Sequence, residues 1–192
     1  MQYAVLGGPE DGPTVRLDWQ AFSYAGKFVM SNTGKAIAYE GAPLAEREDW
    51  PPAARETDDL VEDVVGAVSF NGDRTDADTA WLRYVTVRDD RRGDGVGANL
   101  CAFAADHLLA DHETVRIAVN NPFAYEALYK AGFGFTGEET GIAELVLERP
   151  AADRAAAYQD GLDRYRERDL SDAEAAFLDR KAGRSPPQRI DA

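Results

Sequence analysis

The sequence predicts an α/β fold, of the α+β kind, with a mixed central sheet of six to seven strands and flanking helices. Three observations support this fold class. Short runs of β-branched and aromatic residues, which favour strands, alternate with segments that favour helices. The first and last strands along the chain are expected to be antiparallel. A glycine-rich stretch within residues 80–100 joins a strand to a helix, and the other elements are organised around it.

The first part of the chain predicts two short strands before a long loop. Residues 3–6 form a strand that ends at a Gly-Gly-Pro turn. Residues 14–30 are expected to form a helix, although the last three could equally be a strand. Four apolar side chains could share one face of that helix: Leu17, Phe22, Ala25 and Val29. Residues 35–39 predict the second strand, and residues 41–59, with three prolines and many charges, predict a loop.

The middle of the chain predicts three strands and two helices. The strand at residues 64–70 is followed by an Asn-Gly-Asp turn and then by the central strand, residues 80–87. A helix is expected from Ala98 to about Ala110, then a strand at residues 114–119. A second helix opens at Pro122, which suits the first helical position.

Two closing strands, at residues 133–138 and 143–148, complete a domain that spans residues 1–150. Residues 151–182 form a helical extension. Its first helix has apolar residues one turn apart, and Ser171 and Glu174 form a capping box that opens the second. The two helices carry too few apolar residues to fold alone, so they should dock on the domain or on a second subunit. Residues 183–192 are expected to be a flexible tail.

The glycine-rich stretch predicts an anion site. Arg92-Gly93-Asp94-Gly95-Val96-Gly97 follows a short charged turn and precedes the helix that Ala98 opens. Glycine permits strained backbone angles and leaves no Cβ in the way of a ligand. The start of a helix directs free N–H groups and the positive end of its dipole at one spot. A phosphate is the most plausible ligand for such a spot.

Spacing separates the kinds of phosphate loop that could fill this stretch. A P-loop ends in Gly-Lys-Ser/Thr, but Gly95 is followed by Val96 and Gly97. The Rossmann pattern fits Gly93, Gly95 and Ala98 superficially. That fold requires the strand to run straight into the first glycine and an acid at the end of the second strand. Here five polar residues lie between the central strand and Gly93, and the next strand ends in two asparagines instead of an acid.

The third pattern, R-x-x-G-x-G, is filled by Arg92, Gly95 and Gly97. It resembles the acyl-CoA pyrophosphate loop of the GNAT superfamily of N-acetyltransferases. A second segment, residues 121–133, is similar to the family's N-x-x-A-x-x-L-Y-x-x-x-G-F segment and follows in the right order. The resemblance covers residues 34–149. It implies the GNAT fold, in which two neighbouring parallel strands splay apart at the centre of the sheet and acetyl-CoA enters the cleft.

The resemblance also implies which residues hold the cofactor. Backbone groups of Val85 and Val87 would pair with the pantetheine like an added strand. Asn121 looks like the family's cofactor-contacting asparagine, although it is equally credible as the N-cap of the next helix. Arg91 could reach an outer phosphate or could be a solvated turn residue. Loop residues would hold the diphosphate: Arg92, Gly93, Asp94, Gly95, Val96, Gly97 and Ala98.

The implied reaction is direct attack of a primary amine on the acetyl thioester. Many family members place a tyrosine where Tyr129 stands, and its phenol would protonate the departing thiolate. A base must act on the amine, yet residues 80–88 contain no acid. Glu40, Glu62, Asp63 and Glu144 stay open as bases, as does a chain of waters.

Composition narrows the class of protein. The chain has 35 acidic against 21 basic residues, a net charge of −14, which disfavours nonspecific binding to nucleic acid or anionic membranes. The small number of lysines and the excess of acidic residues suggest a halophilic protein, from an organism with an acidic proteome. One cysteine, Cys101, excludes an internal disulfide and is expected in the core. No apolar run is long enough to span a membrane, so we expect a cytoplasmic protein. Neither His107 nor His112 has a second ligand candidate at metal spacing, so we expect no metal.

The sequence therefore predicts an acetyl-CoA-dependent N-acetyltransferase that acts on an amine of a small molecule or protein, and a homodimer is possible. Two alternatives stay open. The first is a GNAT-fold module that binds acyl-CoA without turnover, as a sensor or subunit. The second is a Rossmann-like NAD-binding protein. An acidic rim would favour a cationic acceptor such as a polyamine.

Overall fold

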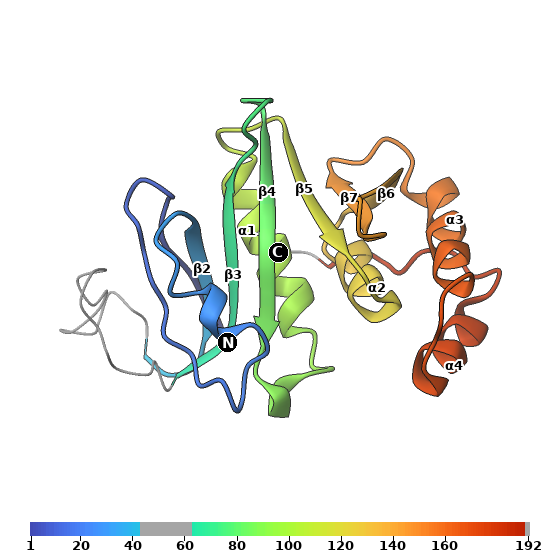
Figure 1. Cartoon of the computed structure of the whole chain (residues 1–192), viewed down its shortest axis with the longest axis horizontal. Coiled ribbons are helices and arrows are strands. Elements are labelled where there is room, and N and C mark those ends of the chain that lie inside the picture. The colour runs from blue at the N-terminus through green and yellow to red at the C-terminus, as the bar shows by residue number, and fades with distance from the viewer. Residues whose placement is uncertain (43–62, 191–192) are drawn as a thin grey trace.

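The computed structural model of the chain describes residues 1–42 and 63–190. Those residues form one seven-stranded sheet in the order β1-β2-β3-β4-β5-β7-β6 (Figure 1). Only β4 and β5 are parallel, and every other neighbouring pair is antiparallel. The mixed sheet confirms the predicted fold class. The strands are β1 Gln2–Gly7, β2 Gly34–Tyr39, β3 Val64–Gly72, β4 Thr79–Val87, β5 Thr114–Val119, β6 Gly134–Glu139 and β7 Leu145–Arg149.

Four α-helices accompany the sheet in the described ranges. They are α1 Val96–Leu108, α2 Pro122–Lys130, α3 Arg154–Arg166 and α4 Asp172–Lys181. Helix α1 lies behind β3 and β4, α2 lies next to β5, and α3 and α4 form the far end of the molecule (Figure 1). None of the described helices is long and apolar enough to cross a membrane.

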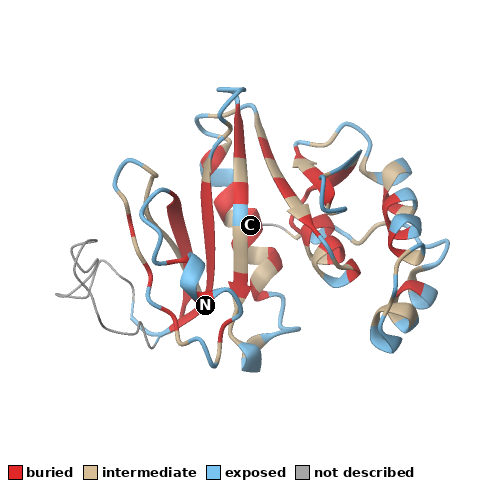
Figure 2. Ribbon diagram, viewed as in Figure 1, coloured by how far each residue is buried: buried red, intermediate tan, exposed pale blue. Residues whose placement is uncertain are grey.

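The sheet is buried on both faces at its centre. Strands β2 and β3 are buried along almost their whole length (Figure 2). The larger core joins one face of the sheet to α1 and continues through α2 to the C-terminal helices. The smaller core covers the other face, where the segment before β2 packs Val15, Leu17 and Phe28 against Ile37 and Ala67. Burial on two faces explains why these strands read as continuous apolar runs rather than alternating ones.

The helix expected at residues 14–30 is wrong. Most of that segment has no regular structure, and its one helical turn is the 3-10 helix Ala25–Lys27. Val15 and Leu17 are buried while Arg16 is exposed, which is the period of two of an extended chain. The Val15 N–H donates to the Phe28 carbonyl at 2.9 Å, so the segment folds back on itself. Apolar spacing alone could not separate this arrangement from a helix.

The C-terminal extension packs on the domain through buried tyrosines. Tyr158, Leu162 and Tyr165 of α3 are at most 1% exposed. The Tyr165 hydroxyl donates to the carbonyl of Val119, the last residue of β5, at 3.0 Å. Glu126 of α2 is buried, accepts from the Tyr158 hydroxyl and pairs with Lys181 of α4. These contacts tie both helices to α2 and to the end of β5.

The last described residues run back along the domain without regular structure. The Ile190 N–H donates to the Lys130 carbonyl at 2.9 Å, and the side chain of Arg189 lies against Gly132. The capping box predicted for α4 is present, with the Ser171 side chain and the Glu174 side chain each bonded to the other's backbone N–H.

The contact between α2 and α3 predicts the effect of a methyl group at Gly161. A Cβ there would lie 2.1 Å from the Tyr125 hydroxyl oxygen, so α3 would have to move. An exposed Gly→Ala change in a helix usually stabilises by about 0.5–1 kcal/mol, whereas overpacking a core costs about 1–3 kcal/mol. We expect Gly161→Ala to lower the free energy of unfolding in urea by about 1–3 kcal/mol. Gly26→Ala, where nothing lies within 4 Å of the new Cβ, is the matched control and should be near neutral. A stabilised Gly161→Ala variant would contradict this packing.

Candidate functional site

The two parallel strands separate inside the sheet. Pairing of β4 with β5 runs from Thr79–Thr114 to Leu82–Ile117 and goes no further. Beyond that point β5 pairs only with β7, and β4 pairs only with β3. Figure 1 shows the strands diverging toward their carboxyl ends. The predicted splay of the central pair is therefore present, and one edge of β4 from residue 83 onward has no strand partner among the described residues.

A β-bulge in β4 lies where the gap begins. Leu82 pairs with Phe70 and Tyr84 pairs with Ser69, so Arg83 is an extra residue with no partner on β3. In a regular strand Leu82 and Tyr84 would share a face. Here Leu82 is in the core under α1, whereas Tyr84 packs against the core on the opposite face. The bulge thus turns the side chains of the strand at the opening of the gap, and nothing in the sequence indicated it.

The glycine loop lies at the carboxyl end of β4, next to the gap. Gly93 and Gly95 have φ of +93° and +83°, the left-handed region that glycine tolerates best. Gly95 is the N-cap of α1 and has no side chain to satisfy the first N–H groups, those of Val96, Gly97 and Ala98. A Cβ on Gly97 would lie 3.4 Å from a methyl of Val87, which shows how closely the helix start approaches the strand. The loop therefore has the backbone geometry expected of an anion site, and its contact with a phosphate stays a prediction.

The charged residues of the loop are held by contacts of their own. Arg91 pairs with Glu40 and, at 3.3 Å, with Asp94. Arg92 pairs with Asp89 and donates to the Ser23 hydroxyl at 2.8 Å. The pairing of Glu40 with Arg91 places this candidate base beside the loop.

Asn121 caps α2. Its Oδ1 accepts from the Ala124 N–H at 2.8 Å, and Pro122 occupies the first turn of the helix. The N-cap interpretation of Asn121 is confirmed, and its contact with a cofactor stays a prediction. The side-chain amide also donates to Asn120 at 3.2 Å, at the end of β5.

Tyr129 is enclosed in the core. It has no exposed surface, its hydroxyl accepts from the Phe135 N–H at 3.0 Å, and the Tyr125 hydroxyl lies 3.3 Å away. Burial raises its pKa. The Arg154 guanidinium lies over its ring, 5.6 Å from the centroid. The side chain of Tyr129 is thus enclosed between its own helix, α2, and the elements α3 and β6. Its role as an acid stays a prediction.

The spacing of the second motif explains where Tyr129 points. The family pattern has two residues between alanine and leucine and three between tyrosine and glycine. This chain has three residues between Ala124 and Leu128, and two between Tyr129 and Gly132. With Ala124 and Gly132 aligned, Leu128 stands at the tyrosine position, and Tyr129 is one residue further. One residue turns a side chain by about 100° around a helix of 3.6 residues per turn.

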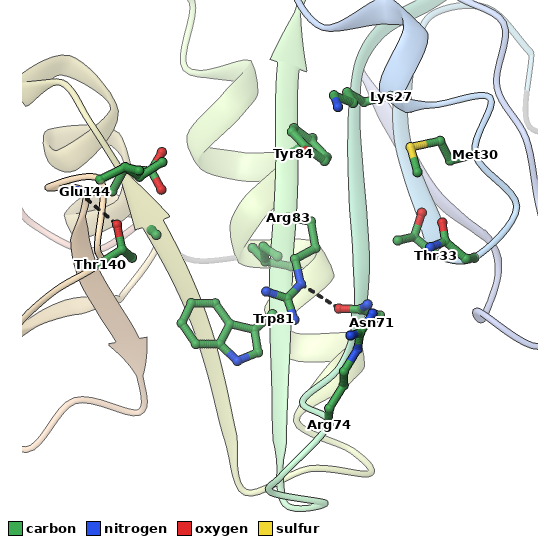
Figure 3. A pocket seen from close by; sticks show the side chains of 14 residues that line it. Lys27, Met30, Thr33, Asn71, Arg74, Trp81, Arg83, Tyr84, Thr140 and Glu144 are labelled. Carbon is green, nitrogen blue, oxygen red and sulfur yellow. Dashed lines mark hydrogen bonds between the residues drawn. The ribbon is translucent and has the colours of Figure 1, made fainter.

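A pocket of about 750 Å³ opens beside the gap, over β4 and β5 (Figure 3). Figure 3 shows Thr140 and Glu144 on one side of the gap, and Arg83, Asn71 and Arg74 on the other. The segment before β2 closes the pocket at its far wall. The lining side chains also include Lys27, Met30, Asn32, Thr33, Trp81, Leu82, Tyr84, Ala118 and Ile142.

Glu144 is the candidate base that lines this pocket. It is half-buried and immediately precedes β7, whose Leu145 pairs with Val119 at the end of β5. The Glu144 N–H donates to the Thr140 hydroxyl at 3.1 Å, in a tight turn where Ala143 has φ of +60°. Asp63 is exposed and immediately precedes β3, and Glu62 lies outside the described residues.

A buried lysine supports the far wall of the pocket. Lys35 has no exposed surface, and its ammonium donates to the carbonyls of Met30 at 2.9 Å and Thr33 at 2.7 Å. Burial lowers its pKa to about 8. Sequence reasoning missed this residue, because a lysine inside a strand reads as a solvent-facing position.

Other candidate groups lie away from the site. Cys101 is buried in α1, and burial raises the pKa of its thiol to about 12, so it belongs to the core as predicted. The His112 ring bonds to the Leu108 carbonyl at 3.0 Å, at the end of α1. Residues 1–42 and 63–190 contain no group of three or more side chains arranged to hold a metal ion.

Comparison with known proteins gives a family match. The sequence profile described as "Acetyltransferase (GNAT) family" matches residues 16–135. Among solved structures, the chain is similar to a GCN5-related N-acetyltransferase from Kribbella flavida, with 21% identity, a TM-score of 0.43, and coverage of 62% of this chain and 68% of that one. A nourseothricin acetyltransferase gives 16% identity, a TM-score of 0.46, and coverage of 77% and 96%.

A third solved structure is the PaiA N-acetyltransferase from Thermoplasma acidophilum in complex with coenzyme A. It gives 19% identity, a TM-score of 0.37, and coverage of 45% of this chain and 53% of that one, so the match spans about half of its length. Curated protein sequences give no match.

Proposed function

The chain belongs to the GNAT acetyltransferase family, and on that premise we propose that it is an N-acetyltransferase. It transfers an acetyl group from acetyl-CoA to a primary amine by direct attack. The observation that carries the proposal is the gap between β4 and β5, with the glycine loop and the start of α1 at its end. A pocket with a carboxylate in its wall opens beside the same gap.

The gap and the loop together fit the two ends of acetyl-CoA. The open edge of β4, at Val85 and Val87, offers backbone groups to the amides of pantetheine, as an added strand would. The N–H groups from Gly93 to Ala98 bind the diphosphate, and Arg92 adds positive charge. Asp94 contributes only its backbone, because its carboxylate is paired with Arg91.

The amine needs a base before it can attack. A lysine-like amine with a pKa of about 10.4 costs about 4–5 kcal/mol to deprotonate at neutral pH. Glu144 takes that proton, directly or through a water. The amine nitrogen then forms a bond to the acetyl carbon, the carbon–sulfur bond breaks, and the electron pair leaves with the sulfur. The nitrogen loses its second proton and the thiolate takes up one proton, which gives free CoA and the acetylated amine.

The loop is tested by Gly95→Val, which puts a branched side chain among the amides that hold the diphosphate. We expect the affinity for acetyl-CoA, measured by calorimetry, to fall about a hundredfold, or by about 2.8 kcal/mol. Gly137→Val is the matched control. Gly137 has φ of +86°, nothing lies within 4 Å of a new Cβ, and it does not line the pocket, so it carries similar backbone strain away from the site. Equal affinity in both variants would contradict the assignment of the loop.

The same calorimetry, combined with a thiol-release assay over a panel of amines, separates the two classes of function. An acetyltransferase binds acetyl-CoA and releases thiol with at least one amine. A non-catalytic acyl-CoA sensor binds acetyl-CoA and releases no thiol with any amine or peptide. Binding of NAD without binding of CoA would overturn both.

Glu144→Gln tests the base. The amide cannot accept the proton, so we expect kcat to fall by about 10²–10⁴ and the pH–rate profile to lose the limb that the carboxylate causes. Acetyl-CoA affinity should not change. Glu138→Gln, an exposed carboxylate of the same hairpin that does not line the pocket, should keep kcat. Full activity of Glu144→Gln would remove Glu144 from the mechanism.

Tyr129→Phe decides between two roles for Tyr129. If the phenol protonates the thiolate, kcat falls while the affinity for acetyl-CoA is unchanged. If it serves only packing, turnover stays equal. In either case the free energy of unfolding drops by about 1–3 kcal/mol, because the buried Phe135 N–H loses its acceptor. Turnover equal to that of the unmodified protein would end the acid role.

A further inference from the structure

The charges that line the pocket differ from those of the protein as a whole. The chain carries a net charge of −14, yet the lining has three cationic side chains, Lys27, Arg74 and Arg83, against one carboxylate, Glu144. An excess of cations at one concave site of an acidic protein is the charge pattern that attracts an anion.

Arg83 is oriented for binding at the pocket wall. It is the extra residue of the β4 bulge, so its side chain belongs to neither regular face of the strand. Its Nε donates to the Asn71 Oδ1 at 2.6 Å, and the guanidinium lies over the Trp81 ring, 5.0 Å from the centroid. These two contacts fix the plane of the guanidinium and leave its two terminal nitrogens to bind another group. In the described part of the chain, no carboxylate lies within ion-pair distance of Arg83.

Arg74 reinforces the same spot from the loop between β3 and β4 (Figure 3). Burial lowers the pKa of the Arg83 guanidinium, the charge of Asp73 opposes that shift, and the charge of Arg74 adds to it, so the two arginines are close enough to act on each other. Neither a hydrogen bond nor an ion pair ties down its guanidinium within residues 1–42 and 63–190. Asp73 attracts Arg83 without forming an ion pair with it, so an anion that contacts both guanidinium groups would further offset the repulsion between them.

Asp73 is the nearby carboxylate, and its oxygens are already in use. They accept from the Trp81 indole N–H at 2.7 Å, from the Thr75 N–H and hydroxyl, each at 2.8 Å, and from the Asp76 N–H. Hydrogen bonds from Thr75 and Trp81 hold the pKa of Asp73 well below its usual range. Asp73 therefore positions Trp81 under Arg83 and does not pair with the guanidinium.

We propose that the acceptor amine carries an anionic group, a carboxylate or a phosphate, which the guanidinium groups of Arg83 and Arg74 bind. This proposal rests on the proposed acetyltransferase function. The acceptor lies across the gap, with its amine at Glu144 and its anionic end at the opposite wall (Figure 3). The planar fork of an arginine guanidinium can form paired hydrogen bonds with a carboxylate or with a phosphate. Experiment decides which of these two groups the natural acceptor carries.

A matched panel of acceptors tests the proposal. Amino acids with a terminal amine and three to six carbons are compared with their primary amides and with diamines of the same length, and 2-aminoethyl phosphate represents the phosphate source. We expect kcat/KM for the anionic acceptors to exceed that for the amides by about tenfold or more. The anionic group of the acceptor with the higher kcat/KM, carboxylate or phosphate, is the group that the natural acceptor carries. Amides or diamines preferred over the acids would overturn the proposal.

Arg83→Gln and Arg74→Gln give the second arm. Each should raise KM for the anionic acceptors about tenfold, with KM for the amides and affinity for acetyl-CoA unchanged. Arg180→Gln, an exposed arginine outside the pocket, is the control and should change none of these. Equal KM values for the anionic acceptors in all three variants would contradict the role of the arginines.

Direct binding separates failure of this proposal from failure of the proposed function. Calorimetric titration of the preferred amino acid, or of 5-aminopentanoate if no amine releases thiol, needs no turnover. Binding that Arg83→Gln and Arg74→Gln each weaken about tenfold, with no thiol released, leaves the anion site standing and removes the acetyltransferase. Thiol release that is insensitive to both variants leaves the acetyltransferase standing and removes the anion site.

Discussion

Two neighbouring parallel strands, β4 and β5, separate inside the sheet after Leu82 and Ile117, and the backbone groups that face the gap must find partners elsewhere. Unpaired peptide groups within a sheet are costly unless water or a ligand satisfies them. An extended ligand with amides of its own is the partner that such an edge fits best. The loop at Gly93 and Gly95 lies where the charged end of that ligand would emerge, so one backbone arrangement accounts for both parts of the site.

The contacts that keep β5 away from β4 come from its other side. Val119 pairs with Leu145 of β7, and its carbonyl accepts from the Tyr165 hydroxyl. The helical extension therefore holds the end of β5 in place, although it contributes no residue to the pocket. Tyr129 belongs to this support, since its hydroxyl bonds within the tyrosine cluster between α2, α3 and β6. The extension is thus part of what shapes the site.

Local patterns made much of the fold predictable. The strand at residues 114–119 matches the structure to the residue, and the Ser171 capping box is formed as expected. These features depend on neighbours in the sequence. The helix expected at residues 14–30 failed because tertiary contacts, such as that between Val15 and Phe28, decide the conformation of that segment.

The functional site was only partly predictable. The loop motif indicated the phosphate end, because its glycines carry a local backbone requirement. The bulge at Arg83 and the position of Glu144 have no local signal, since each depends on the register between strands far apart in the sequence. The predicted loop at residues 41–59 lies largely outside the described residues. The one-residue offset at Tyr129 was readable from the spacing to Gly132, and the Tyr129 side chain is buried with its hydroxyl bonded to the Phe135 N–H.

Amide hydrogen exchange with and without acetyl-CoA is the sharpest test of ligand binding at the gap and the loop, because it reports on individual backbone N–H groups. If acetyl-CoA binds there, saturating acetyl-CoA slows exchange at residues 83–87 of β4 and at residues 93–98, and leaves β1 and β2 unchanged. Exchange rates in both segments that are the same with and without acetyl-CoA, in protein that is folded, would contradict it.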